Sequence, residues 1–165
     1  MSEKPRSVPL PQSGPAPTVD QSVWYAKGLR FECSQCGNCC SGFPGYVWLT
    51  IDYMTRIAQH LQLPIDDFTK KYVRRVGTRY SLIEKFDYDC IFLTRENGKI
   101  GCGIYPVRPM QCRTWPFWDA NLSSPKAWKT AAERAHGCPG MCDAEAPLYP
   151  LEHIEKCRQH PESPR

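Results

Sequence analysis

The chain has 165 residues, enough for one domain of modest size, and 41% of them are hydrophobic. Its 21 lysines and arginines against 17 aspartates and glutamates give a net charge of +4, which is too weak to indicate a nucleic-acid partner. Ten cysteines, 16 prolines and 11 glycines indicate many turns and little long regular structure, so we expect an α+β fold in a small single domain that metal or cross-links stabilise.

Residues 1–22 are rich in proline and serine and poor in large apolar side chains, which predicts a disordered tail. They contain no apolar run typical of a secretory signal, and no stretch of the chain reaches the ~20 apolar residues of a membrane span. We therefore expect a cytoplasmic protein without a membrane partner. Because the cytosol keeps thiols reduced, clustered cysteines there indicate metal ligands or redox groups rather than disulfides.

Two helices are predicted in the first half of the metal-binding domain, which we place at residues 23–158. Thr50 has the position of an N-cap for a helix that runs to about Leu61, and a second helix follows Pro64. Their apolar faces comprise Ile51, Met54, Ile57, Ala58 and Leu61 in the first helix, and Ile65, Phe68, Tyr72, Val73 and Val76 in the second. Four cations lie away from the apolar face of the second helix, and they indicate a solvated helix face rather than a phosphate-binding one: Lys70, Lys71, Arg74 and Arg75.

Strand-like segments surround and follow these helices. Short extended pieces are expected at 30–32 and 46–50. Residues 79–86 and 89–95 are also strand-like, and ENGK at 96–99 contains an Asn-Gly pair that favours a tight hairpin turn before a return strand. Cys90 lies near the start of one strand and Cys102 within its partner.

Two more helices are predicted in the last third of the chain. Ser124 and Pro125 suit the N-cap and first turn of a helix that reaches about His136, and a last helix begins near Pro150. Residues 159–165 form a polar C-terminal tail. The predicted domain therefore combines a cysteine knuckle, a β-hairpin and about four short helices.

The knuckle is the sequence CSQCGNCC at residues 33–40, with four cysteines in eight positions. C-x2-C is the spacing at which two thiolates from one tight turn reach the same metal, and Gly37 allows backbone N–H groups to point at the sulfurs. The run C-x2-C-x2-C also resembles the start of a ferredoxin motif, in which a distant Cys-Pro, here Cys138-Pro139, completes a cluster. Because Cys40 departs from that motif, zinc and iron–sulfur both remain open.

The adjacent pair Cys39 and Cys40 indicates how the sulfurs are shared. Successive side chains of an extended segment point to opposite sides, so one of the pair can join Cys33 and Cys36 while the other faces away. The away-facing thiol would then meet three later cysteines, Cys90, Cys102 and Cys112. Two four-sulfur sites that share one knuckle are one interpretation, and a single polynuclear cluster with extra thiols is the other.

The ordered motifs CSQCGNCC, DCIFL, CGIYPVRPMQCRTWPF and GCPG resemble the CxxCxxCC cysteine-cluster family, also called YkgJ-like, from about residue 29 to 140. That family is described as a zinc- or iron-chelating domain. Ile91 stands where the family often has proline, a minor departure. The resemblance implies eight metal ligands: Cys33, Cys36, Cys39, Cys40, Cys90, Cys102, Cys112 and Cys138.

Two cysteines lie outside the family pattern. Cys142 and Cys157, with Cys138 and His160, have the spacing of a zinc site with three sulfurs and one nitrogen. We favour the simpler interpretation, in which Cys157 is a buried small residue and Cys142 a loop thiol. The other three histidines are expected to be ordinary helix residues away from the sulfurs: His60, His136 and His153.

Charged and aromatic side chains flank Cys112. The guanidinium groups of Arg108 and Arg113 either offset the negative charge of a thiolate site or bind the turn by hydrogen bonds. Three aromatic residues follow, and a place in the core is favoured over a lid on the metal site: Trp115, Phe117 and Trp118.

The sequence indicates a metal protein and names no catalytic residue, because it contains no recognisable triad, carboxylate pair or phosphate loop. We favour an iron–sulfur cluster of the 4Fe–4S type with a redox or electron-transfer role, served by a protein partner or electron donor. A structural zinc-binding module for protein interaction is the alternative. A third possibility rests on resemblance alone, since flagellin lysine N-methylases carry a similar cysteine motif.

Overall fold

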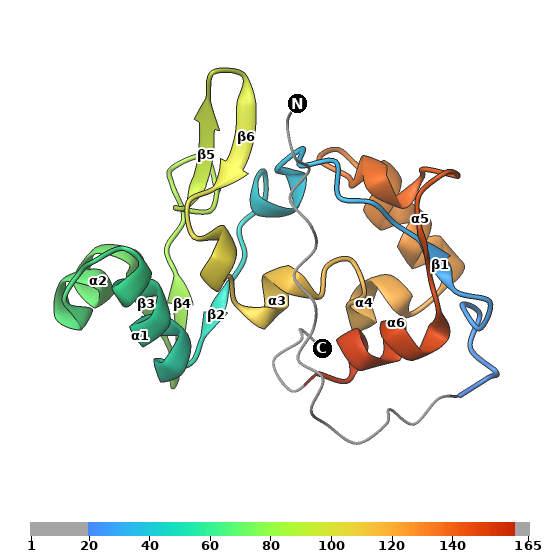
Figure 1. Cartoon of the computed structure of the whole chain (residues 1–165), viewed down its shortest axis with the longest axis horizontal. Helices are drawn as coiled ribbons and strands as arrows, with labels where there is room; N and C mark the ends of the chain where they lie inside the picture. The colour runs from blue at the N-terminus through green and yellow to red at the C-terminus, as the bar shows by residue number, and fades with distance from the viewer. Residues whose placement is uncertain (1–19, 161–165) are drawn as a thin grey trace.

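The computed structural model describes residues 20–160, and the outer parts of both predicted tails, residues 1–19 and 161–165, lie outside the described residues. Within the described part the chain has six α-helices and seven strands, which confirms the α+β prediction. Figure 1 shows the helices α1 and α2 at one end of the molecule and α4, α5 and α6 at the other. The element containing the first cysteines lies between these two halves.

The first half is a three-stranded antiparallel sheet covered by two helices. The strand order is β2-β4-β3. The elements are β2 (Trp48–Leu49), α1 (Ile51–His60), α2 (Ile65–Tyr72), β3 (Val73–Val76) and β4 (Arg79–Leu82). Apolar side chains of both helices and the sheet form one core: Leu49, Tyr53, Met54, Ile57, Ala58, Phe68, Leu82, Phe92, Ile104 and Met110.

Helix α1 begins where the sequence predicts. The Thr50 hydroxyl accepts a hydrogen bond from the Tyr53 N–H at 3.3 Å, as an N-cap does. The predicted apolar face is right at Met54 and Ile57 but wrong at Ile51, whose side chain is 63% exposed. Ile51 occupies the first helical position, which lies beyond the edge of the core, and the aromatic ring of Tyr53 is buried instead.

Helix α2 is shorter than predicted. Its apolar stripe was expected to continue to Val76, but the helix ends at Tyr72 and residues 73–76 are β3. β-Branched side chains such as that of Val73 favour a pleated strand. The turn at Gly77 then reverses the chain, so that Val73 of β3 pairs with Leu82 of β4 (Arg79–Leu82). Of the cations expected on the helix, Lys70, Lys71 and Arg75 are exposed, whereas Arg74 forms an ion pair with Glu84 at 3.1 Å.

The predicted hairpin forms from β5 (Leu93–Glu96) and β6 (Lys99–Cys102). Asn97 and Gly98 both have positive φ angles, 52° and 74°, as the tight turn of a hairpin requires. The segment 79–86 pairs with β2 and β3 rather than with this hairpin, apart from an isolated bridge between Glu84 and Cys90.

The second half packs three short helices around a separate core. Its elements are β1 (Leu29–Arg30), α4 (Asp119–Leu122), α5 (Pro125–Glu133), β7 (Leu148–Tyr149) and α6 (Leu151–Arg158), and α3 (Met110–Arg113) precedes α4 with its Met110 in the first core. Strands β1 and β7 pair antiparallel. The core contains Tyr25, Phe31, Phe117, Leu122, Ala131, Ala132, Cys138, Met141, Leu151, Ile154 and Cys157.

The two helices predicted in this half are present, but α5 ends earlier than expected. Ser124 caps α5 by accepting from the Ala127 N–H at 3.1 Å, in agreement with the sequence. The helix stops at Glu133 instead of His136, because Arg134 adopts an extended conformation and its carbonyl accepts from the Gly137 N–H at 2.6 Å. This early end brings Gly137 and Cys138 to the middle of the molecule.

We predict that Thr50→Ala lowers the free energy of unfolding by about 1 kcal/mol, because it leaves the Tyr53 N–H without its cap. A thermal melt followed by circular dichroism measures this loss. Thr55→Ala is the matched control, since the Thr55 hydroxyl is exposed and bonds only the preceding turn of α1. Equal melting temperatures for the Thr50 variant and the parent chain would contradict the prediction.

No helix among residues 20–160 has the length and apolar character needed to cross a membrane.

Candidate metal centre

The cysteine knuckle lies between the two halves and is bound to both. Its middle is a 3-10 turn at Asn38–Cys40, preceded by Gly37 in a left-handed conformation with φ 74°. A Cβ on Gly37 would lie 2.6 Å from the Ile100 side chain of the hairpin, so only glycine permits this approach. On the other side, the Asn38 side-chain amide donates to the Gly137 carbonyl at 2.8 Å.

The hairpin brings two cysteines to the knuckle. The Cys90 N–H donates directly to the Cys40 carbonyl at 2.7 Å. The Leu93 N–H donates to the Cys90 carbonyl, and Leu93 is paired with Cys102 across the hairpin. The expectation that the knuckle lies beside the hairpin is therefore confirmed.

The loop after α5 places Cys138 at the other end of the knuckle. Two hydrogen bonds fix it there: Asn38 to Gly137, and the Glu32 N–H to the Gly140 carbonyl at 3.1 Å. The Trp115 indole N–H also donates to the Cys138 sulfur at 3.5 Å. Cys138 is buried as a result.

Charge effects among the eight motif thiols link them in two overlapping sets, and Cys39 acts on members of both. Cys33 and Cys138 are each influenced by Cys36 and Cys39, which defines a first group of four. Cys40 is influenced by Cys90 and Cys112, and Cys102 acts on both of these, which defines a second group of four. We call these the first and second thiol groups: Cys33, Cys36, Cys39 and Cys138, and Cys40, Cys90, Cys102 and Cys112.

Cys39 is the contact point between the two thiol groups. Its sulfur lies 3.7 Å from that of Cys40, and its charge also acts on Cys102 and Cys112. The hydrogen bond from the Cys40 thiol, together with nearby Arg108, lowers the pKa of Cys39 to about 7. The same hydrogen bond and burial raise the pKa of Cys40.

Burial dominates the electrostatics of the other motif thiols. It raises the pKa of Cys90, Cys102 and Cys112, and neighbouring thiols raise the pKa of each further. A set of buried sulfurs that discourage one another's ionisation needs a cation before all of them can be thiolates. Thiolates are the ligands that zinc and iron–sulfur clusters use, so the donor set fits either group.

The described residues do not form a finished coordination sphere. Among residues 20–160, no three His, Cys, Asp or Glu side chains are arranged so that they could hold one ion where they stand. None of the eight motif cysteines is in a disulfide. Binding of a metal by these thiols requires their deprotonation.

Of the two predicted interpretations, binding of the turn is confirmed for Arg113. Arg113 binds the turn: its Nε donates to the Arg108 carbonyl at 2.9 Å and its Nη2 to the Pro106 carbonyl at 2.6 Å. The Arg108 guanidinium instead packs on the Tyr105 ring, 3.8 Å from its centroid, and its positive charge opposes the rise that burial causes in the pKa of Cys33 and Cys102.

The comparison with known protein families agrees with this arrangement. Residues 32–144 match the CxxCxxCC family, described as a "Putative zinc- or iron-chelating domain". The chain belongs to the CxxCxxCC family. An uncharacterized protein of Methanocaldococcus jannaschii is 33% identical over 93 residues, which cover 56% of this chain and 48% of that protein. The chain thus spans about half the length of this curated relative. No solved structure matches the chain.

The two cysteines outside the CxxCxxCC pattern differ in burial. Cys157 is buried in the core of the second half, and burial raises its pKa to about 12. Cys142 is exposed. These positions agree with the simpler interpretation of both residues. One histidine differs from expectation: His136 lies beyond the end of α5, with φ 58°, where its ring packs against Gly42.

The aromatic residues after Cys112 divide between core and metal centre. Phe117 is buried in the second core, as expected. The Trp118 indole N–H donates to the Gln111 carbonyl at 3.1 Å. Only Trp115 reaches a motif sulfur, at Cys138.

Two polar residues near the sulfurs were missed in the sequence. Lys85 donates to the Leu93 carbonyl at 2.7 Å and opposes the burial that raises the pKa of Cys90. Asn38 is the residue that joins the knuckle to the second half. The position of Asn38 inside the motif was a usable signal, whereas nothing in the sequence around Lys85 indicated its role.

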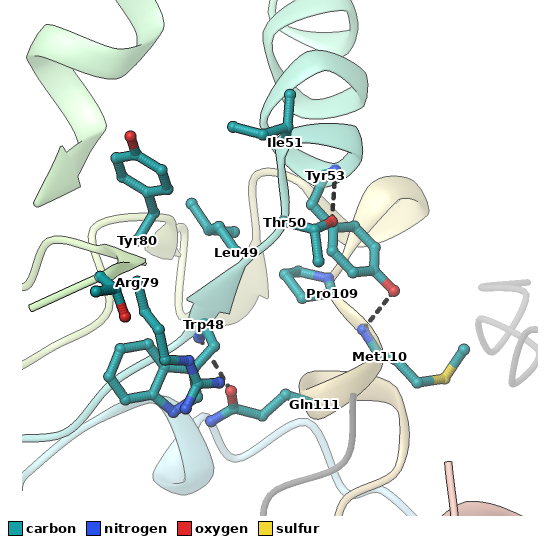
Figure 2. A pocket seen from close by; sticks show the side chains of 11 residues that line it. Trp48, Leu49, Thr50, Ile51, Tyr53, Arg79, Tyr80, Pro109, Met110 and Gln111 are labelled. Atoms are coloured by element: carbon teal, nitrogen blue, oxygen red, sulfur yellow. Dashed lines mark hydrogen bonds between the residues drawn. The ribbon is translucent and has the colours of Figure 1, made fainter. Parts of the chain in front are cut away.

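A surface cavity of about 350 Å³ lies apart from the motif cysteines. Figure 2 shows that three of its polar contacts are internal to the protein: Trp48 N–H to Gln111, Met110 N–H to the Tyr53 hydroxyl, and the Thr50 cap. Arg79 stacks on the Trp48 ring, 3.8 Å from its centroid. No motif cysteine lines the cavity, so it is not part of the metal centre.

Proposed function

We propose that this CxxCxxCC protein binds an iron–sulfur cluster through its eight motif cysteines and has a redox or electron-transfer role. Three contacts support the proposal: the Cys39 and Cys40 sulfurs lie 3.7 Å apart, the Cys90 N–H donates to the Cys40 carbonyl, and Asn38 joins the knuckle to the loop that carries Cys138. Eight thiolates exceed the four that one tetrahedral zinc ion uses. A polynuclear centre uses more of the sulfur that the fold gathers.

The surrounding residues suit such a centre. A bound iron–sulfur cluster supplies a group that gains or loses one electron, at a potential that hydrogen bonds and charge near the sulfurs adjust. Trp115 donates such a hydrogen bond to Cys138, and Arg108 supplies positive charge. Cys33 and Cys39 are exposed, so this side of the knuckle offers a partner protein the shortest route to the centre.

A structural zinc module is the second candidate, and a specific observation favours it. Eight cysteines are twice the four that a structural zinc ion takes, and the knuckle makes hydrogen bonds toward both Cys90 and the Cys138 loop. Two zinc ions would hold the two halves together at the knuckle, and the protein would then act by binding another protein.

Purification without oxygen, followed by assays of iron, acid-labile sulfide and zinc, separates the two candidates. We expect iron and sulfide in equal amounts, a brown protein and reversible bleaching by dithionite. Two zinc ions per chain with no sulfide would contradict the iron–sulfur proposal and support the structural zinc module. A protein that binds neither metal would contradict both.

A further inference from the structure

The surface cavity of about 350 Å³ lies where three parts of the protein meet. Figure 2 shows that its lining comes from the strands β2 and β4, from the start of α1, and from the segment that leads into α3. A volume of this size is at the lower end of the range for small-molecule sites in proteins. The lining residues are separate from the motif cysteines, so the metal centre does not explain the cavity.

The Arg79 guanidinium is held at the cavity and has no acceptor within the described part of the chain. Its carbon lies 3.8 Å from the centroid of the Trp48 ring, and that ring in turn stacks on Tyr46 with the two centroids 4.7 Å apart. Stacking uses the face of a guanidinium and leaves the N–H donors in its plane free. Among residues 20–160, the Arg79 side chain forms no hydrogen bond and no ion pair.

Arg74 stacks on the same aromatic pair but differs in this respect. Its guanidinium carbon lies 5.0 Å from the centroid of the Tyr46 ring. Its Nη2 donates to the Gly45 carbonyl at 2.6 Å and to the Glu84 carboxylate at 3.1 Å. Arg74 therefore serves the hydrogen bonding of the fold, whereas Arg79 presents a fork of N–H donors at the cavity.

The side chains that line the cavity carry one positive charge and no negative charge. Arg79 is the cation, and none of the lining residues is an aspartate or a glutamate. Asp52, the nearest acid in the sequence, is not on the lining and pairs with Arg56 at 3.6 Å. The hydroxyl groups of Thr50 and Thr78 add further hydrogen-bond donors. This lining favours a ligand with an anionic acceptor, and a planar carboxylate matches the fork of a guanidinium.

The rest of the lining is mostly apolar. Ile51 lines the cavity, and its side chain is 63% exposed to solvent. Leu49, Pro109 and Met110 are also on the lining. A ligand that covers Ile51 removes apolar surface from water, which is favourable in proportion to the area covered. The cavity therefore suits a ligand that joins a carboxylate to an apolar body.

We propose that this cavity binds a small organic carboxylate with an apolar body. The carboxylate pairs with the Arg79 guanidinium, and the apolar body covers Ile51. The inference goes beyond the proposed function and does not depend on it, because no motif cysteine lines the cavity.

Isothermal titration calorimetry of the full chain as purified tests the proposal. The probes are 3-phenylpropionate and its uncharged amide, 3-phenylpropanamide, which has nearly the same size. We expect one equivalent of the carboxylate to bind, and the amide to bind roughly 10- to 100-fold more weakly, the effect of losing a hydrogen bond to a charged group. Arg79→Gln should weaken binding of the carboxylate by the same factor. Lys70→Gln is its control, because it removes a positive charge from the exposed surface of α2.

Ile51→Ser tests the apolar contact, because an exposed side chain can be changed without opening the core. It should weaken binding of the carboxylate about 4-fold, the effect of one buried methylene group. Ile65→Ser is the matched control: Ile65 is the first residue of α2, as Ile51 is of α1, and it is 42% exposed but not on the cavity lining. Both control variants should bind with parent affinity, and circular dichroism establishes that each variant is folded.

Three results would overturn the inference. One is the absence of saturable binding of 3-phenylpropionate by the parent chain up to about 10 mM. Equal affinities for the carboxylate and the amide would contradict pairing with Arg79. Parent-like binding by both Arg79→Gln and Ile51→Ser would place the ligand elsewhere on the protein. If Arg79→Gln does not fold, the amide and Ile51→Ser decide.

Discussion

Replacing Cys39 by serine should remove most of the bound metal and leave the domain largely unfolded. Cys39 touches Cys40 and acts on thiols of both groups, so its loss affects every metal–thiolate contact near the knuckle. Binding of a structural metal to thiolates stabilises a small fold by about 10 kcal/mol or more, which is comparable with the whole stability of a domain. Metal analysis and a thermal melt of the purified variant measure both effects.

The same loss is expected for Cys36→Ser, because Cys36 acts on Cys33 and Cys138 in the first thiol group. Cys142→Ser is the matched control: Cys142 is an exposed cysteine outside the family pattern, and its variant should keep the metal content and melting temperature of the parent. Full metal content and unchanged stability in both the Cys36 and the Cys39 variants would refute metal binding by the motif.

Gly140→Ala should destabilise the protein by about 3 kcal/mol, at the upper end of the cost of overpacking. A Cβ at this position would overlap the backbone carbonyl of Glu32, and a backbone group cannot move aside as a side chain can. The Glu32 N–H also donates to the Gly140 carbonyl, so the overlap would separate the Cys138 loop from the start of the knuckle. Metal should then be lost from the first thiol group before the second.

Urea unfolding gives the change in free energy, and an anaerobic titration of the metal-free chain with Co²⁺ gives the number of metal ions that bind. Gly45→Ala is the control, because an added Cβ there has nothing within 4 Å and its φ is not in the left-handed region. Its effect should stay within about 0.5 kcal/mol, as for ordinary surface changes. Equal stability of the two alanine variants would show that the close approach at Gly140 is not required.

Gly37 and Gly140 also show why the family motifs contain glycine beside cysteine. Gly37 turns the knuckle in a left-handed conformation against the hairpin, and Gly140 lets the Cys138 loop approach residue 32. Each contact joins the knuckle to a different half of the protein. The cysteines supply the ligands, and the glycines allow the backbones that carry them to meet.

Local features of the chain were predictable from the sequence because their causes are local. The Thr50 and Ser124 caps form hydrogen bonds within three residues, and the Asn97-Gly98 turn depends on φ angles that these two residues tolerate. The order and spacing of the cysteine motifs likewise indicated the family from the sequence alone. The presence of a metal-binding domain and its α+β class therefore followed from the sequence.

The end of helix α2 and the roles of Arg108 and Arg113 were decided only by the tertiary structure, because these features depend on residues that are far away in the chain. Val73 and Val76 fit the apolar stripe of a helix until β4 supplies strand pairing, which is why α2 ends at Tyr72. In the same way, the sequence around Arg108 and Arg113 allows either arginine to bind the turn or to offset the negative charge of a thiolate site. The difference between them, with Arg113 bound to the turn and Arg108 packed on the Tyr105 ring, arises from how the loop folds.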